Sequence, residues 1–402
     1  MIRGESFVYY GPEPWQGMWR NRHQLLSRLA RGGQVVYIEP RPYIEQVIGG
    51  LRTGELHAAD LWRDRGLSPA LPGLWTYRAP RYAPLGGPPP VRAACHWLRR
   101  AALRRDLAAA GVRRPIVWIS TPTQFDARDD LPARLRVYHI VDDYLGYHDL
   151  PAAQRPRWAR LERALIDWAD LVIAVSPELM QTKGGLPQGG CNPKFRLLPN
   201  AVDPRPYADD RPLGPAAELL GLSRPLLGYV GLVSVRLDLA LLDELAARHP
   251  EWTLVLIGAV SRSGCGELLD RLVARPNVRL LPPVPAERVA DYVRRFDVGL
   301  APYRVTQETI HASPLKIYEY LAAGLPVVAA DVPGARQFAD VLALADTADA
   351  WEAAIVRQLA AASAEAIAAR RRAVAPHTWD ARVETLSGYL AEALERAAAS
   401  DA

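Results

Sequence analysis

The sequence predicts an α/β protein made of two parallel-sheet domains in tandem. At 402 residues, the chain is too long for one ordinary domain. Short β-branched runs alternate with longer amphipathic stretches, the pattern of a parallel sheet with helices on both faces. This alternation stops at Pro199–Pro215, which is dense in Pro and Asp, and then restarts. The interruption indicates a linker between two units of the same kind.

In the first half, each expected strand is a short apolar run bounded by turn residues. One helix is well marked because Leu25, Leu26 and Leu29 share a face at helical spacing. Residues 43–90 are rich in Pro and Gly, so we expect an irregular insertion over the surface. The expected strands are Ser6–Tyr10, Val35–Glu39, Pro115–Ser120, Arg136–Val141 and Leu171–Val175, and the expected helix is Arg20–Ala30.

In the second half, a helical pattern follows each expected strand, and the Ala- and Arg-rich tail from Asp349 reads as helical with a break near Pro376. We expect an N-terminal domain over residues 1–200, a C-terminal domain over 201–375 and a helical tail over 376–402 that packs back toward the N-terminal domain. The expected strands are Leu226–Val230, Thr253–Ile257, Val278–Leu281, Val298–Pro302 and Pro326–Ala330.

The composition of the chain limits its expected cellular location and the kinds of partner that it can bind. No apolar run reaches the length of about 18 residues that a membrane-spanning helix needs. The N-terminus carries early charges, and the three cysteines lack disulfide or metal spacing, so we expect a cytoplasmic protein. Residues 1–205 hold 29 Lys and Arg against 19 Asp and Glu, whereas residues 206–402 hold 20 against 25.

The basic first half favours an anionic partner: a lipid headgroup, the inner face of a membrane bound peripherally, a phosphorylated acceptor or nucleic acid. A solvated surface from a biased composition explains the charge equally well, because 46 arginines stand beside three lysines. Nucleic acid is the weakest of these options, since no recognised binding module is present. We therefore expect no nucleic acid among the partners.

The most specific segment is Val298–Ala330, with the sequence VGLAPYRVTQETIHASPLKIYEYLAAGLPVVAA. It predicts a buried strand, a polar loop and a helix over Pro314–Ala323. Ser313 suits the N-cap, Pro314 the first helical position and Gly324 the left-handed position after the helix. The helix then begins at the carboxyl end of the sheet, where ligands bind in doubly wound folds.

The start of this helix combines the groups that a nucleotide diphosphate needs. Free N–H groups at Ser313–Lys316 and the positive end of the helix dipole favour an anion. Lys316 lies in the first turn, where the dipole disfavours a cation unless an anion binds there. Glu319 lies on the same face and can accept hydrogen bonds from both hydroxyls of a ribose. The alternative is an ordinary exposed Lys–Glu pair.

The string SPLKIYEYLAAGLPVVA resembles the donor-site signature of the group 1 (family 4) glycosyltransferases, which have the GT-B fold of two Rossmann-like domains facing across a cleft. Other strings are similar to that family in the same order: GYVGLVSVRLDLALLDELAARHPEWTLVLIG, RRFDVGLAPY, RLLPNAVD and HTWDARVETLSGYL. In the N-terminal half, WRNRHQLLSRLARGGQVVYIEP, YHIVDDY and WADLVIAVSPELM resemble the bacterial branch that builds polysaccharides of the cell envelope.

This resemblance implies a nucleotide-sugar donor, UDP- or GDP-linked, and transfer to a hydroxyl of a glycan, a lipid-linked or a small-molecule acceptor. It further implies a retaining mechanism without a cofactor or a metal, and Asp142-Asp143 is not the DxD motif of metal-dependent enzymes. By this resemblance, we expect Lys316 and the backbone around it to hold the diphosphate, Glu319 to hold the ribose and Val284 to lie beside the base. The implied donor-binding residues are Ser313, Pro314, Leu315, Lys316, Glu319, His311, Val284 and Gly17.

Two positions depart from the family pattern. The first C-terminal loop usually carries an Arg and a Lys, but here Arg236 is the only cation available; a guanidinium fork matches phosphate oxygens. The signature usually begins with a glutamate that contacts the donor sugar, and here that position is His311. Either the sugar differs, or Glu308 substitutes, or activity is reduced.

The N-terminal half offers candidates for the opposite side of the cleft. Gly17 can meet the diphosphate from a glycine-containing loop, and an aspartate at position 142 or 143 can deprotonate the acceptor hydroxyl. Each has a structural alternative as a turn or cap residue. The candidates are Arg20, His139 and Tyr144 on the acceptor side, and Asp142, Asp143, Arg236 and Lys316 in catalysis. Two other functions stay open: a non-catalytic nucleotide-sugar-binding scaffold of the same fold and a sugar-nucleotide epimerase.

Overall fold

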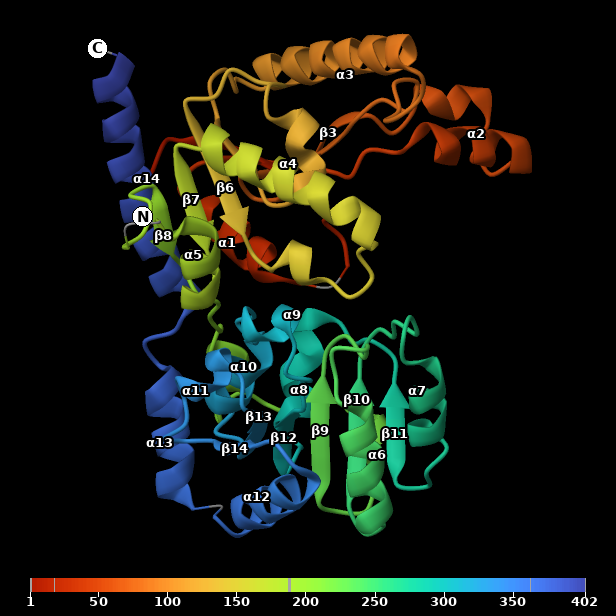
Figure 1. Ribbon diagram of the computed structural model, residues 1–402, viewed down its shortest axis with the longest axis vertical. Coiled ribbons are helices and arrows are strands. Elements are labelled where there is room, and N and C mark those ends of the chain that lie inside the picture. Colours follow the sequence, from red (N-terminus) through yellow and green to blue (C-terminus); the bar gives the residue numbers. More distant parts are fainter. Residues whose placement is uncertain (1, 18, 187–188, 362, 402) are drawn as a thin grey trace.

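The computed structural model describes residues 2–17, 19–186, 189–361 and 363–401, and it contains two sheets whose carboxyl ends face each other (Figure 1). The prediction of two parallel-sheet domains is confirmed. The N-terminal sheet has the strand order β3-β4-β2-β1-β5-β6-β7-β8 and is parallel except at β3. Its strands are β1 Ser6–Tyr10, β2 Gln34–Ile38, β3 Gly66–Leu71, β4 Leu74–Arg78, β5 Ile116–Ile119, β6 Leu135–Ile140, β7 Leu171–Ala174 and β8 Phe195–Leu197.

Helices cover both faces of this sheet, and two apolar clusters fill the layers between sheet and helices. The strands alternate between the two clusters, so that Val137 of β6 joins one and Tyr138 joins the other. The helices of this half are α1 Asn21–Leu29, α2 Ile44–Thr53, α3 Pro89–Ala109, α4 Arg155–Trp168 and α5 Pro177–Gly184, with short 3-10 turns that include η2 Pro122–Ala127 and η3 Tyr144–Gly146.

The C-terminal sheet has the order β11-β10-β9-β12-β13-β14 and is parallel throughout its described pairs. Its strands are β9 Leu226–Val230, β10 Thr253–Ile257, β11 Val278–Leu281, β12 Val298–Ala301, β13 Val327–Ala330 and β14 Ala343–Ala345. The helices are α6 Leu239–Arg248, α7 Gly266–Val273, α8 Val289–Val293, α9 Gln307–Ile310, α10 Leu315–Ala322, α11 Pro333–Arg336, α12 Ala348–Ala360, α13 Ala364–Val374 and α14 Trp379–Asp401. Within the described ranges, no helix is both long enough and apolar enough to span a bilayer.

The prediction that residues 43–90 are irregular is wrong. This segment contains α2, a β3–β4 hairpin and the first turn of α3, and β4 pairs with β2 in parallel. The sequence of β4, LWTYR, is rich in the aromatic and β-branched residues that favour strands. Pro and Gly in the connecting turns hid this pattern, because they mark the ends of elements as well as loops.

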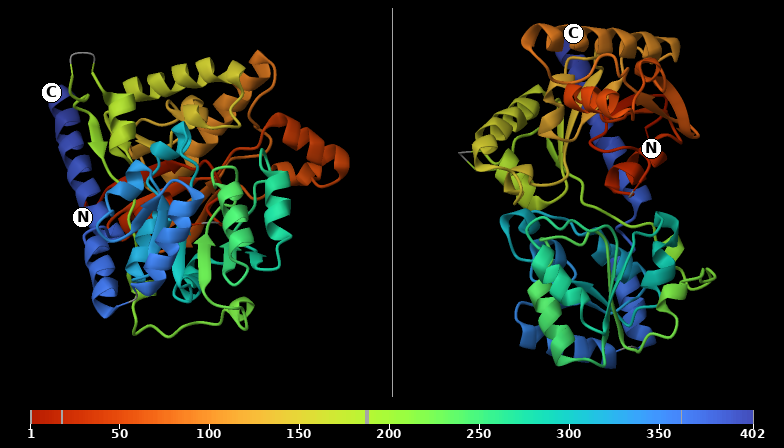
Figure 2. Two further views of the ribbon diagram at one scale, coloured as in Figure 1. Left: turned by 60° about the horizontal axis from the view of Figure 1, so that its bottom comes forward. Right: turned by 90° about the vertical axis from the view of Figure 1, so that its right-hand side faces the viewer.

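The chain crosses between the two domains twice, and the two crossings pair with each other. On the way out, Val202 donates its N–H to the carbonyl of His377 (3.0 Å), and Trp379 donates its N–H back to the carbonyl of Val202 (3.1 Å). After this crossing α14 runs along the N-terminal domain (Figure 2). Its apolar residues, from Trp379 to Ala393, join the same buried cluster as strands β1, β5 and β6. The last helix is therefore part of the N-terminal core.

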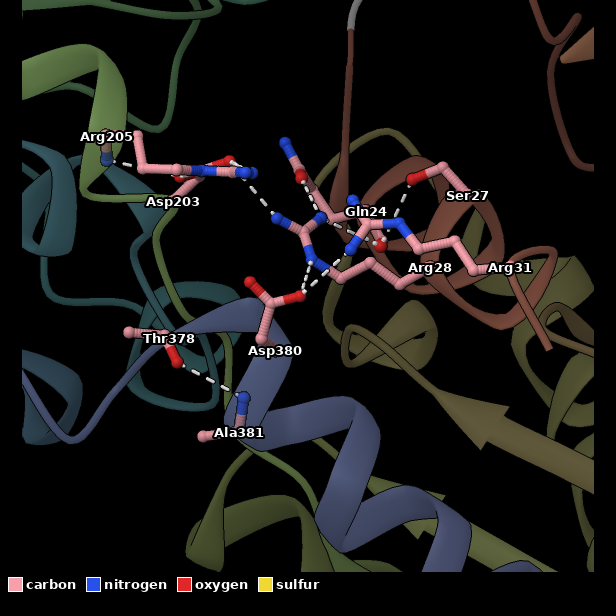
Figure 3. Close-up of polar contacts among 9 residues, drawn as sticks. All are labelled: Gln24, Ser27, Arg28, Arg31, Asp203, Arg205, Thr378, Asp380 and Ala381. Carbon is pink, nitrogen blue, oxygen red and sulfur yellow. Dashed lines mark hydrogen bonds and ion pairs between the residues drawn. The ribbon is translucent and has the colours of Figure 1, made fainter. Parts of the chain in front are cut away.

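A buried arginine ties this crossing to the first helix (Figure 3). Arg28 of α1 is 3% exposed and contacts carboxylates from both crossings, Asp203 at 3.2 Å and Asp380 at 3.0 Å. It also donates to the backbone and side-chain oxygens of Gln24. Arg31 contacts the same Asp380 at 3.4 Å, but its side chain is 54% exposed. Arg28 therefore fixes where the outgoing and returning segments meet.

We expect Arg28→Met to lower the free energy of unfolding by about 2 kcal/mol, because it leaves Asp203 without its buried partner. Arg31→Met is the matched control and should change stability by less than about 0.5 kcal/mol, since exposed ion pairs contribute little. Urea unfolding followed by tryptophan fluorescence measures both. Equal effects of the two substitutions would contradict the role assigned to Arg28.

Candidate active site between the two domains

The polar residues predicted from sequence lie where strands of the two sheets end opposite each other. Asp142 and Asp143 directly follow β6 in the N-terminal domain. In the C-terminal domain, Arg236 lies in the loop after β9, and α9 and α10 follow β12. Because carboxyl ends of parallel strands lie on one edge of a sheet, these residues come from two facing edges (Figure 1).

Helix α10 begins one residue later than predicted, at Leu315, and Ser313 is not its cap. The Ser313 hydroxyl accepts a hydrogen bond from the N–H of Asn200 (3.3 Å), and its carbonyl accepts one from the Asn200 side chain (2.7 Å). Pro314 takes the N-cap position, where it has no side-chain oxygen to accept a hydrogen bond from the first turn. The helix ends as predicted, with Gly324 at φ +72°. The first turn thus leans on the interdomain linker and keeps its N-terminal end free of a side-chain cap.

Lys316 projects from the first turn of α10 toward the end of β9. Its ammonium lies 5.3 Å from the ring centre of Tyr229, a cation–π contact. Gly231 has φ +147°, a conformation that favours glycine, and a Cβ there would come within 2.2 Å of Lys316 Cε, so glycine also leaves room for the lysine. Among the described residues, Lys316 forms no ion pair with a carboxylate within 4.0 Å. Its charge is therefore available to an anion.

Glu319 follows one turn later and is partly buried. Burial raises the pKa of its carboxyl to about 7, and this rise is only partly opposed by the charge of Lys316 and by a hydrogen bond from Tyr207. Tyr207 belongs to the interdomain linker and is 5% exposed. At neutral pH the carboxyl is therefore close to half ionised, and its charge responds to groups that approach it.

Arg236 bridges the two domains. Its guanidinium donates to Asp142 Oδ2 at 2.9 Å and also contacts Glu308 of α9. It lies over the ring of Tyr147, whose hydroxyl donates to the same Asp142 oxygen (2.9 Å). His148 approaches the other oxygen of Glu308 at 3.6 Å. The cation predicted to bind diphosphate is thus held by carboxylates from both domains.

Asp143 points into a second, more deeply buried cluster. It is 1% exposed and contacts Lys183 Nζ at 2.9 Å, and Lys183 also contacts Glu162 at 2.9 Å. Gln307 of α9 donates to Asp143 as well (3.4 Å). The two neighbouring aspartates therefore differ in environment. Asp143 is committed to a buried ion pair, so the structure does not support it as the group that deprotonates an acceptor.

His311 lies in the same interface, where it contacts residues of the N-terminal domain. It is 6% exposed, and its Nδ1 lies 3.0 Å from Asp143 Oδ2, without the alignment of a hydrogen bond. Its Nε2 is 3.4 Å from the hydroxyl of Thr182, and its carbonyl accepts a hydrogen bond from Ser176 (2.8 Å). In this conformation His311 joins the domains, which corrects its predicted position against the donor.

Two acceptor-side predictions are contradicted by burial. His139 is 1% exposed and packs 5.6 Å from the ring centre of Trp118, and burial lowers its pKa to about 3. It is a neutral core residue. Side chains of β6 alternate between the two faces of the sheet, and His139 lies on the same buried face as Val137. Tyr144 is 6% exposed, and its hydroxyl already donates to the carbonyl of Ser120 (2.9 Å). Neither side chain faces an acceptor here.

The remaining predicted residues lie near the facing edges. Gly17 has φ +134° with open space around it, which suits a glycine loop. Arg20 is engaged by Glu13 at 3.0 Å, and Glu13 also holds Arg22. Val284 follows β11 and packs partly buried against the C-terminal core. Their contacts with a donor or an acceptor stay predictions.

Sequence reasoning missed Lys183, Glu162, His148 and Gln307. Lys183 carried one signal, because it is one of only three lysines beside 46 arginines. No group of three or more His, Cys, Asp or Glu with metal-binding geometry occurs among the described residues.

The fold that these elements build is GT-B. A sucrose-phosphate synthase from Thermosynechococcus elongatus superposes with a TM-score of 0.70 over 98% of this chain and all of that chain, at 20% identity. Anabaena HepE in complex with UDP and glucose superposes with a TM-score of 0.65 over 96% of this chain and all of that chain, at 14% identity. At these identities the likeness establishes the fold alone.

Residues 224–361 match the family model described as glycosyl transferases group 1, which confirms the resemblance seen in the sequence. TuaH of Bacillus subtilis, described as a teichuronic acid biosynthesis glycosyltransferase, is 29% identical over 140 residues. That match spans about a third of the length of the curated relative and of this chain, 35% of each.

The raised pKa of Glu319 makes stability depend on pH. Because its pKa in the folded protein lies above the unfolded value, its contribution is complete below about pH 4.5 and is lost as pH rises through 7. Replacing Glu319 by Gln should remove this loss, so the variant gains about 3 kcal/mol relative to wild type between pH 4.5 and 8.5. Urea unfolding at both pH values measures the difference. A difference that does not change with pH would contradict the assigned pKa.

Proposed function

We propose that this chain is a glycosyltransferase that moves a sugar from a nucleotide diphosphate to an acceptor hydroxyl. The single observation that supports this most is the ammonium of Lys316, which has no carboxylate partner among the described residues, at the uncapped start of α10, with Glu319 one turn deeper. A diphosphate placed there contacts the ammonium and the N–H groups of the first turn, and its ribose reaches the carboxylate. The group 1 family match over the same segment supports the proposal independently.

Arg236 supplies the second cation, and its present partners explain how it is kept in place without a donor. Asp142 and Glu308 neutralise it, and Tyr147 supports its guanidinium. A bound diphosphate competes with these carboxylates, because its oxygens match the same fork of N–H groups. As the bond from the anomeric carbon to the diphosphate breaks, Lys316 and Arg236 stabilise the charge that develops on the leaving group.

The same exchange releases Asp142. Its carboxylate is 17% exposed, lies at the end of β6 and is then free to accept the proton of the acceptor hydroxyl. The hydroxyl oxygen forms the new bond to the anomeric carbon. This sequence of contacts uses protein cations in place of a metal, and we propose a metal-independent reaction. Retention of configuration follows from the family resemblance.

The substrate classes are proposals of the same kind. HepE was solved with UDP and glucose and TuaH is described as acting in teichuronic acid biosynthesis, which supports a UDP-sugar and a cell-envelope glycan or lipid-linked acceptor. The excess of basic residues in the first half supports a peripheral contact with an anionic membrane on the cytoplasmic side.

A thermal-shift screen against UDP-, GDP-, ADP- and dTDP-sugars tests the donor site. A donor at 100 times its dissociation constant adds about 2.7 kcal/mol to stability. Lys316→Ala should abolish the shift. Lys194→Ala is the control and should retain the shift, because the Lys194 ammonium donates to backbone carbonyls of Asp167 and Ala169 in the N-terminal domain. No shift with any nucleotide, or a shift unchanged by Lys316→Ala, would remove the donor site from this position. A shift without sugar transfer to a panel of acceptors would favour the non-catalytic scaffold.

Asp142→Asn separates the two roles of that carboxylate. The donor no longer competes with one negative charge on Arg236, so its dissociation constant should fall about threefold to tenfold. The proton acceptor is lost at the same time, so kcat should fall about 100-fold or more. Asp149→Asn is the control, because Asp149 lies in the same loop region and, among the described residues, forms no ion pair with Arg236. Weaker donor binding by Asp142→Asn would contradict the competition.

A further inference from the structure

A large hollow lies on the N-terminal domain far from the residues described above. It has a volume of about 770 Å³ and is lined by residues that precede β5, β6 and β7, together with parts of α3, α4 and α14. The carboxyl ends of those strands face the C-terminal domain, so the hollow is at the opposite edge of the sheet. Helix α3 and the last turns of α14 mark this end of the molecule in both views (Figures 1 and 2).

The lining is strongly basic. Seven of the 15 lining residues are arginines and two are aspartates, a net charge of +5. Four of the arginines form ion pairs with nearby carboxylates: Arg128 with Asp129 (3.1 Å), Arg134 with Glu5 (2.8 Å), Arg136 with Asp170 (2.7 Å) and Arg396 with Glu392 (3.9 Å).

Three arginines carry the remaining charge. Arg104 donates to the carbonyl of Asp130 (2.7 Å), which holds its side chain in place without neutralising it. Arg100 lies one turn earlier on α3, and Arg114 lies in the turn before β5. Among the described residues, none of these three forms an ion pair with a carboxylate. Like charges held together around a hollow repel one another unless an anion binds between them.

We propose that this arginine-lined hollow binds a phosphate-bearing anion. Guanidinium groups pair with phosphate oxygens through two parallel hydrogen bonds, and several of them around one concave surface can hold a headgroup or an oligophosphate. The site is separate from the donor site, because it lies at the other edge of the sheet and shares no residue with it. It therefore stands whether or not the proposed transfer reaction is correct.

The surface beside the hollow points to a lipid headgroup as the source of the phosphate. Trp97 lies on α3 three residues before Arg100, on the same side of the helix, and it is 68% exposed. Tryptophan favours the boundary between water and acyl chains, where arginines meet anionic headgroups. A soluble oligophosphate has the same phosphate groups but no acyl chains that the exposed indole of Trp97 could contact.

The test compares two phosphate sources on the whole protein. Phosphatidylcholine vesicles with and without phosphatidylglycerol provide the lipid arm by co-sedimentation, and inorganic tripolyphosphate provides the soluble arm by calorimetry. The variant is Arg100→Gln combined with Arg114→Gln. Its matched control is Arg157→Gln combined with Arg160→Gln, which removes the same charge from exposed positions on α4. The tripolyphosphate titration is repeated with Lys316→Ala to exclude the donor site.

Wild type and the control should bind the anionic vesicles, and the hollow variant should bind them about tenfold more weakly. Binding of tripolyphosphate alone, with the same loss in the hollow variant and no loss in Lys316→Ala, would keep the phosphate site and assign it a soluble ligand. Absence of binding in both arms, or equal weakening in the α4 control, would overturn the proposal.

Discussion

The structure depends on charges that are paired across the boundary between its two domains. Arg236 joins Asp142 of one domain to Glu308 of the other, and the buried Asp143, which pairs with Lys183 inside the N-terminal domain, also accepts a hydrogen bond from Gln307 of α9. Burying such charges is costly unless each has its partner, so these pairs hold the facing edges in one register. They also make the boundary polar. A polar boundary joined by two chain crossings can separate and reform more readily than an apolar core.

In the proposed function, this arrangement ties donor binding to the contact between domains. Arg236 is 31% exposed, and its guanidinium matches phosphate oxygens; in the proposed function, Asp142 and Glu308 take the place of the diphosphate when no donor is bound. Each of those carboxylates comes from an element at the carboxyl edge of a sheet. A ligand that replaces these carboxylates on Arg236 therefore changes the contacts between the domains, and no other element is needed to couple donor binding to those contacts.

Much of the fold was predictable because its strands are short, apolar and β-branched. The bounds of β1, β9, β10 and β11 match the prediction to the residue. Strands β8 and β14 were missed because three residues are too few to show a pattern. The site was harder to predict, since Arg236 and Asp142 are 94 residues apart and no local spacing records their contact. The prediction that Ser313 caps α10 was wrong for the same reason, because the Ser313 hydroxyl accepts a hydrogen bond from Asn200, which is distant in the sequence.

The structure shows where the excess basic residues of the first half of the chain lie. In the sequence, the excess of arginine in the first half was equally consistent with a surface that faces an anionic partner and with a solvated one. At the donor-facing edge of that half, Asp142 and Asp143 point toward the C-terminal domain and Lys183 is neutralised. Unpaired arginines instead gather at the far edge of the same sheet. A parallel sheet keeps its two edges chemically independent, because each loop belongs to one end only. The two proposed sites of the N-terminal domain, carboxylates toward the sugar and arginines toward an anion, can therefore coexist without either set neutralising the other.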